Sequence, residues 1–156
     1  MKVAILADNP TILTGYGKIA YYFGKYLLRA GIEVVYFGFQ HMGGPVYVKV
    51  EDSLVPLYSC YNGDGARLER CLRETKPDIL VHIRDAFAHL KEFFPAAYQV
   101  RPICQRYGVK TILWTPVQSE PLPRQFAQAC NTESDLTLVP TKWGREQLLW
   151  TGVPEG

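Results

Sequence analysis

The sequence lacks the cysteine and histidine patterns of disulfide-stapled domains and of metal sites. Its four cysteines, Cys60, Cys71, Cys104 and Cys130, are widely separated and form no C-x-x-C pair. A chain of 156 residues can bury a hydrophobic core without disulfide support, so we expect reduced thiols. The histidines have no further ligand at metal-binding spacing, and no metal ion is therefore expected.

Blocks of like charge and long apolar runs are absent as well. The 17 basic and 15 acidic residues are interspersed, which gives no reason to expect a nucleic-acid partner. No apolar run approaches the ~20 residues that span a bilayer, and the first residues lack the regions of a secretory signal. Contact with a membrane surface is conceivable, but no amphipathic basic helix supports it. We therefore expect a soluble, cytoplasmic protein.

What the sequence does contain is an alternation of strand-like and helix-like segments along its whole length. Strands are predicted at residues 3–7, 32–39, 79–83, 111–114 and 136–139, with one or two more within 46–61. Helices are predicted at residues 19–30, 66–75, 124–130 and 141–150, with one or two segments in 86–107 broken near Pro95 and Pro102. Asp64 is a candidate N-cap of the helix at 66–75, and Thr141 is one for the helix at 141–150. This order predicts an α/β fold in which helices cover both faces of a doubly wound, mostly parallel sheet. No internal repeat is present, and we expect a single domain over residues 1–156.

The stretch of residues 8–18 (DNPTILTGYGK) lies between the first predicted strand and the first predicted helix. Ligands of open α/β sheets bind at the carboxyl ends of strands, where a helix N-terminus offers unpaired N–H groups to an anion. Gly15 and Gly17 would let the backbone approach a phosphate closely. The alternative is a tight turn that needs glycine for backbone reasons alone. Lys18 either adds positive charge to such a site or is a solvated surface residue.

Polar residues also follow two later strands of the predicted sheet. Arg84 and Asp85 come directly after one strand, and Gln118, Ser119 and Glu120 follow the next. The carboxyl ends of parallel strands share one edge of a sheet, so these residues are expected to border the same crevice. Arg84 and Asp85 contact a ligand there or form a loop ion pair. Glu120 is the best carboxylate candidate of its loop, although the prolines around it are also explained by a rigid loop.

Four segments together resemble the amino-terminal half of a GT-B glycosyltransferase of retaining family 4, also called group 1. They are residues 14–18 (TGYGK) with 27–34 (LLRAGIEV), 76–82 (KPDILVH), 116–123 (PVQSEPLP), and 134–144 (SDLTLVPTKWG) with 152–154 (GVP). Two positions depart from the family pattern. Ile32 replaces the usual histidine, and Gln118 stands where one branch of the family has an acid.

The resemblance implies a Rossmann-like GT-B N-terminal domain that takes part in moving a sugar from a nucleotide-sugar donor to an acceptor hydroxyl, with retention. No metal or other cofactor is implied, and the acceptor is a sugar, lipid or protein. The family's second domain holds most of the donor, through a pair of glutamates that this chain lacks. The chain would then be the N-terminal half of a two-domain enzyme, incomplete and inactive without its C-terminal domain.

The same resemblance assigns provisional roles to the residues of the predicted crevice. Donor-phosphate binding falls to Gly15, Tyr16, Gly17 and Lys18; the catalytic candidates are Asp85 and Glu120; acceptor binding falls to Arg84, Gln118 and Ser119. A second interpretation remains open at this point. The chain is also consistent with a self-contained Rossmann-like module that binds a nucleotide or a protein partner without catalysis of its own.

Overall fold

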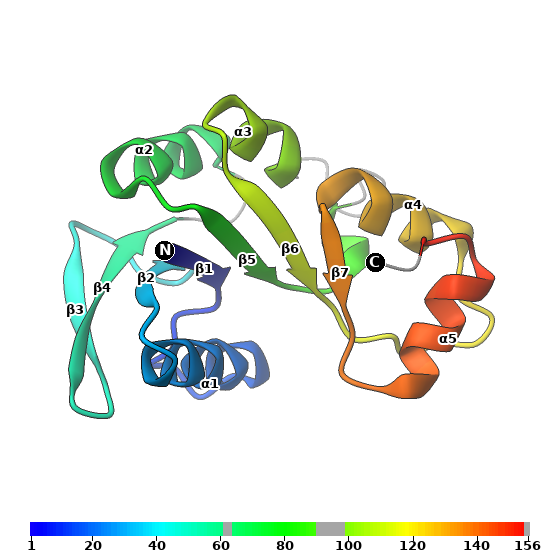
Figure 1. Cartoon of the computed structure of the whole chain (residues 1–156), viewed down its shortest axis with the longest axis horizontal. Coiled ribbons are helices and arrows are strands. Elements are labelled where there is room, and N and C mark those ends of the chain that lie inside the picture. The colour runs from blue at the N-terminus through cyan, green and yellow to red at the C-terminus, as the bar shows by residue number, and fades with distance from the viewer. Residues whose placement is uncertain (61–63, 90–98, 155–156) are drawn as a thin grey trace.

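The computed structural model describes residues 1–60, 64–89 and 99–154, and in this part of the chain seven strands form one sheet. The strand order is β3-β4-β2-β1-β5-β6-β7 (Figure 1). Every neighbouring pair is parallel except β3 and β4, which form an antiparallel hairpin at one edge. The strands are β1 (Lys2–Ala7), β2 (Glu33–Gly38), β3 (Val46–Val50), β4 (Ser53–Ser59), β5 (Ile79–Ile83), β6 (Lys110–Trp114) and β7 (Leu136–Leu138).

Helices cover both faces of this sheet. In Figure 1, α1 lies below the sheet, α2 and α3 lie above it, and α4 and α5 flank the β7 end. The doubly wound, mostly parallel α/β architecture expected from the sequence is therefore confirmed. The helices are α1 (Gly15–Arg29), α2 (Gly65–Thr75), α3 (Val100–Arg106), α4 (Arg124–Glu133) and α5 (Lys142–Trp150), with a short 3-10 turn η1 (Ala86–His89).

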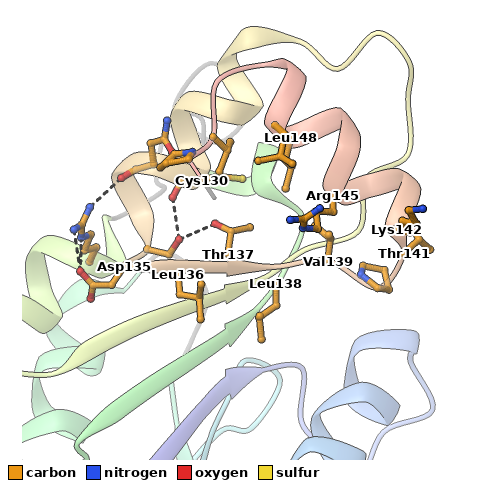
Figure 2. Close-up of a pocket in the computed structure, with 17 residues that line it drawn as sticks. Cys130, Asp135, Leu136, Thr137, Leu138, Val139, Thr141, Lys142, Arg145 and Leu148 are labelled. Carbon is orange, nitrogen blue, oxygen red and sulfur yellow. Dashed lines mark hydrogen bonds and ion pairs between the residues drawn. The ribbon is translucent and has the colours of Figure 1, made fainter. Parts of the chain in front are cut away.

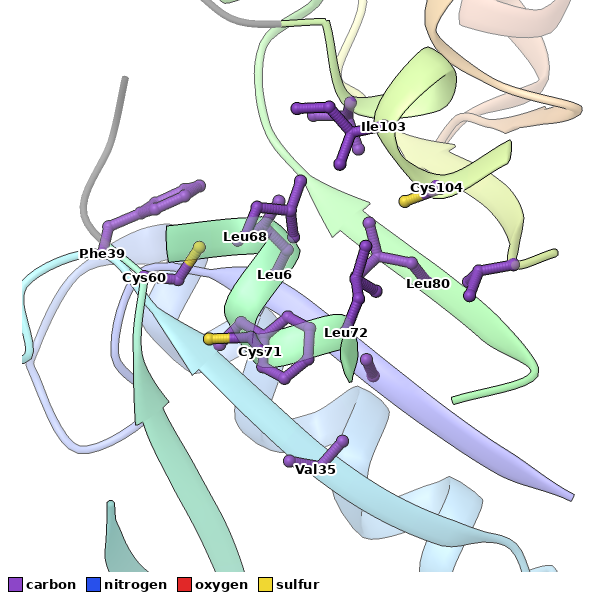
Figure 3. Packing of buried hydrophobic residues seen from close by; sticks show 14 residues of the cluster. Leu6, Val35, Phe39, Cys60, Leu68, Cys71, Leu72, Leu80, Ile103 and Cys104 are labelled. Carbon is purple, nitrogen blue, oxygen red and sulfur yellow. The ribbon is translucent and has the colours of Figure 1, made fainter. Parts of the chain in front are cut away.

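The core has a separate cluster on each face of the sheet, because alternate side chains of a strand point to opposite faces. From β1, Ala4 and Leu6 enter the cluster beneath α2 and α3, whereas Val3 and Ile5 enter the cluster beneath α1. Figure 3 shows the first cluster, in which Leu68 and other residues of α2 pack over the central strands. Burial on both faces explains why the central strands are continuously apolar.

Helix caps account for most of the helix boundaries. Asp64 caps α2, its Oδ1 accepting from the N–H of Arg67 at 3.1 Å, and Thr141 caps α5, its Oγ1 accepting from the N–H of Gly144 at 3.0 Å. Both caps were predicted. The first helix differs, because the pattern placed its start at residue 19 whereas α1 begins at Gly15. Gly15 and Gly17 therefore lie in the first turn of α1, and the loop before the helix ends at Thr14.

Two further boundaries differ from the sequence prediction. Pro102 does not break a helix but lies in the first turn of α3, where a backbone N–H has no intrahelical acceptor to lose. Pro95 lies outside the described residues. The helix predicted at residues 124–130 continues to Glu133, since nothing in its sequence stops it earlier.

Glu133 explains where α3 starts. Its side chain is 2% exposed, and its Oε2 accepts from the N–H of Val100 at 2.8 Å, so a carboxyl from α4 caps a helix that has no cap of its own. Burial raises the pKa of Glu133 above the ordinary value of 4.5, although hydrogen bonds from the backbone of Val100 and Arg101 oppose the shift. The folded state therefore holds this proton more tightly than the unfolded state does.

This linkage predicts a pH-dependent difference between the wild type and Glu133→Gln. The wild-type side chain contributes most stability below its unfolded pKa, and it loses that contribution as the pH rises through its raised folded pKa. Glutamine cannot ionise, so the variant should gain stability relative to the wild type as the pH rises from about 4, the unfolded pKa of glutamate, through the raised folded pKa. Urea unfolding at several pH values measures the difference. The exposed Glu74→Gln should show no such trend, and parallel wild-type and Glu133→Gln profiles would contradict the prediction.

All four cysteines are buried, and none is in a disulfide. Among the described residues, no helix combines the length and the apolar character needed to cross a membrane.

Candidate functional site

The strand order places a topological switch point between β1 and β5. The chain leaves β1 through α1 and returns as β2 on one side, whereas β5 pairs with β1 on the other side. The connections diverge there, and the gap they leave beyond the carboxyl ends of the strands is the usual ligand site of such sheets. The residues that follow β1 and β5 therefore define the candidate site.

The loop after β1 is organised around Asp8. One oxygen of its carboxylate accepts from Thr14 Oγ1 at 2.7 Å, and the other accepts from Gln40 Nε2 at 2.7 Å. Gln40 Oε1 in turn accepts from the backbone N–H of Asn9 at 3.0 Å. Thr14 is also the N-cap of α1, its Oγ1 accepting from the Gly17 N–H at 2.9 Å. A negative charge thus lies next to the N-terminus of α1, as favoured by the helix dipole.

The two glycines of the first turn have different surroundings. A Cβ on Gly17 would lie 2.8 Å from the carbonyl oxygens of Asn9 and Ile12, so this position requires glycine for backbone packing. Its N–H is also occupied by the cap. Gly15 is exposed, and a Cβ there would meet nothing within 4 Å. Within the described residues no acceptor is found for the N–H groups of Gly15 and Tyr16, which leaves them as the backbone donors of the predicted phosphate site.

Tyr16 links this helix end to β5. Its hydroxyl lies close enough to Asp85 for the charge of that carboxylate to act on it, and Asp85 Oδ1 accepts from Gln118 Nε2 at 3.2 Å. The rings of Tyr16 and Trp114 meet edge to face, with centroids 6.3 Å apart. Burial and the nearby charges of Asp85 and Asp8 raise the pKa of Tyr16, so its hydroxyl stays protonated.

The remaining predicted site residues are less closely connected. The Arg84 guanidinium lies over the Phe39 ring, 5.2 Å from its centroid, at the same edge of the sheet. Lys18 is exposed on the first turn of α1, and no ion pair involves it within the described residues. Ser119 is exposed beside Gln118, and Glu120 is exposed further along the loop, where no described residue hydrogen bonds to it. The pairing of Asp85 with Glu120 as catalytic carboxylates stays a prediction.

Asp8 and Gln40 are the residues of this site that the sequence interpretation missed. Asp8 directly follows β1, and Gln40 is the second residue after β2. A polar residue just after a buried strand was also the signal that selected Arg84 and Asp85. Among the described residues, no group of three or more His, Cys, Asp or Glu side chains is placed to hold a metal ion.

A larger pocket of about 840 Å³ lies at the β7 edge, between β7 and α5 (Figure 2). Its polar groups mostly serve the fold. Arg101 pairs with Asp135 at 2.9 Å, and Ser134 Oγ bonds to Thr137 Oγ1 at 3.0 Å and to the Cys130 carbonyl at 2.9 Å. It lies two strands away from the switch point, so the candidate site remains at β1 and β5.

No protein-family model matches the sequence, and no curated protein matches it either. Among solved structures, the fold is similar to that of the Bordetella bronchiseptica enzyme WbmH in complex with NAD⁺, with a TM-score of 0.53 and 15% identity over 97% of this chain and 52% of WbmH. A second similar structure is CobK precorrin-6A reductase, with a TM-score of 0.47 and 17% identity over 100% of this chain and 63% of CobK. The chain spans about half the length of WbmH. The similarity to WbmH supports a Rossmann-like fold for this chain.

Proposed function

We propose that this chain is a Rossmann-like module that binds a nucleotide-containing ligand at the carboxyl ends of β1 and β5. The observation that carries the proposal is the hydrogen bond between Asp85 and Gln118, which lies at the switch point close to Tyr16 and the open first turn of α1. WbmH, which has a similar fold, was crystallised with NAD⁺. That ligand therefore belongs among the first to be tested.

The two parts of the site suit two parts of such a ligand. The N–H groups of Gly15 and Tyr16, at the positive end of the helix dipole, suit a phosphate. Asp85 and Gln118 suit the hydroxyls of a ribose or another sugar, because a carboxylate accepts from a hydroxyl and an amide can both donate and accept. Asp8 already places a negative charge near the helix end, so hydroxyl recognition has to contribute much of the affinity.

Glycosyl transfer is the second candidate. Asp85, Gln118 and Ser119 offer a carboxylate, an amide and a hydroxyl on one side of the crevice, which is a set suited to sugar hydroxyls. Under this proposal the chain is the acceptor-side domain of a retaining enzyme, with Glu120 as a second carboxylate. A nucleotide sugar would be the donor, and activity would require a further domain.

Calorimetric titration of the chain with NAD⁺, ADP, UDP-glucose and GDP-mannose separates the two candidates. A dissociation constant below about 100 μM for any of them supports the self-contained module and counts against a half-enzyme. Millimolar binding that is confined to the nucleotide sugars favours the half-enzyme instead. Absence of binding across the panel overturns the nucleotide proposal.

Asp85→Asn tests the hydroxyl-binding part of the site with little change of shape. Losing the charge weakens its hydrogen bonds to ligand hydroxyls, so we expect affinity for the best ligand of the panel to fall about tenfold, or roughly 1.4 kcal/mol. Asp52→Asn, at the exposed turn between β3 and β4, is the matched control and should bind as the wild type does. Equal affinities for the two variants would remove Asp85 from the site.

A further inference from the structure

An apolar cavity of about 270 Å³ opens beside the Asp85–Gln118 hydrogen bond. Its walls come from four segments: η1, the loop after β6, α4 and α5. Thr115 holds the first two together, because its Oγ1 accepts from the Ala86 N–H at 2.9 Å. Neither the phosphate donors at α1 nor the residues around Asp8 line this cavity. It therefore adjoins the candidate nucleotide site and shares Asp85 and Gln118 with it.

Among the described residues, no charged side chain lines the interior of the cavity. Phe87 and Phe126 meet edge to face, with ring centroids 6.1 Å apart, and the buried side chains of Leu122 and Leu148 also line the cavity. Burial raises the pKa of the Cys130 thiol to about 11, so this residue is neutral as well. The exposed or half-buried polar residues Asp85, Gln118 and Ser119 complete the lining. The cavity thus combines an apolar interior with one polar side.

We propose that this cavity binds the apolar body of a small alcohol or phenol, and that the ligand's hydroxyl lies at Asp85 and Gln118. The inference rests on the proposed function in one respect: if a nucleotide binds at the candidate site, this molecule is a second ligand bound beside it. Binding to the cavity does not itself require a nucleotide.

The size and chemistry of the cavity select this class of ligand. An apolar cavity of about 150 Å³ holds a benzene ring, so the present volume has room for one ring and a short substituent. A hydroxyl can donate to the Asp85 carboxylate and accept from Gln118 or Ser119. A carboxylate at the same place would face Asp85. An ammonium is less suitable because it has no acceptor for the Gln118 amide and would lose hydration against the apolar interior.

The first experiment uses the wild-type chain with benzyl alcohol, toluene, benzylamine and benzoate as probes. Methyl chemical shifts in NMR spectra report the binding, with Leu122 and Leu148 as residues of the cavity and the exposed Leu54 as an internal control. We expect millimolar affinity for benzyl alcohol, at least fivefold weaker binding of toluene and benzylamine, and no binding of benzoate. Tighter binding of benzylamine than of benzyl alcohol would overturn the assignment of the hydroxyl. Unchanged shifts at Leu122 and Leu148 would overturn the cavity as a site.

The second experiment fills the cavity with Val117→Phe and compares it with Val46→Phe, the same change on the exposed first residue of β3. Benzyl alcohol should bind at least tenfold more weakly to the first variant and normally to the second. Circular dichroism checks that each variant is folded. If Val117→Phe is not folded, the methyl chemical shifts of the wild-type chain decide whether the cavity binds the alcohol. Normal binding to folded Val117→Phe contradicts the proposal. Nucleotide titrations of both variants should match the wild type, so a failure of the nucleotide proposal is seen separately.

Discussion

Gly17→Ala is expected to destabilise the chain by about 3 kcal/mol and to abolish ligand binding at the switch point. The added Cβ would lie 2.8 Å from two backbone carbonyl oxygens, those of Asn9 and Ile12, and 3.0 Å from Thr14 Oγ1. Backbone atoms cannot move aside as the end of a flexible side chain can. The loop would therefore have to leave its position, and the Thr14 cap and its bond to Asp8 would be lost with it.

Gly15→Ala is the matched control, because it makes the same chemical change two residues earlier in the same helical turn. A Cβ at Gly15 meets nothing within 4 Å, so stability should change by no more than about 0.5 kcal/mol. The same atom would project into the space offered to a ligand phosphate, and nucleotide affinity should fall. Urea unfolding measures the first effect and calorimetric titration the second. Equal loss of stability in both variants would contradict this account of the loop.

Gly24→Ala is expected to destabilise the chain by about 1–2 kcal/mol, although alanine is the better helix former by roughly 1 kcal/mol. Gly24 is buried where α1 crosses β2, and its new Cβ would meet the Tyr36 hydroxyl and lie 2.7 Å from Tyr36 Cζ. Tyr36 is 1% exposed and part of the core cluster beneath α1, so its ring has little room to move. The strain would push α1 away from the sheet.

A double-mutant cycle with Tyr36→Phe tests this cause. Removing the hydroxyl deletes the nearest atom and sacrifices only a long hydrogen bond of 3.4 Å to the Ala20 carbonyl. The double variant should therefore be more stable than the sum of the two single changes predicts, by about 1 kcal/mol. Thermal or urea unfolding of the four proteins supplies the comparison. If the effects of the two changes on the free energy of unfolding are strictly additive, the Tyr36 hydroxyl is not the reason why residue 24 has to be glycine.

The fold was largely predictable because it depends on local patterns. Continuous apolar runs indicated strands buried on both faces, and Asp64 and Thr141 marked helix starts that the structure confirms. Among the residues that the sequence selected for the crevice, the structure brings some together and leaves others apart. Asp85 and Gln118 do meet, whereas Glu120 remains exposed on its loop and the Gly17 N–H is taken by the N-cap of α1.

The sequence by itself determined the order of strands and helices and the sheet edge at which polar residues gather, since periodicity, caps and glycine positions are local properties of the chain. Only the tertiary structure decided which of those residues touch. Gln118 reaches Asp85 because β6 pairs with β5, and that pairing reflects strand order rather than any pattern within either segment. The apolar cavity likewise arises where four separate segments pack around a common space, so no single stretch of sequence could have revealed it.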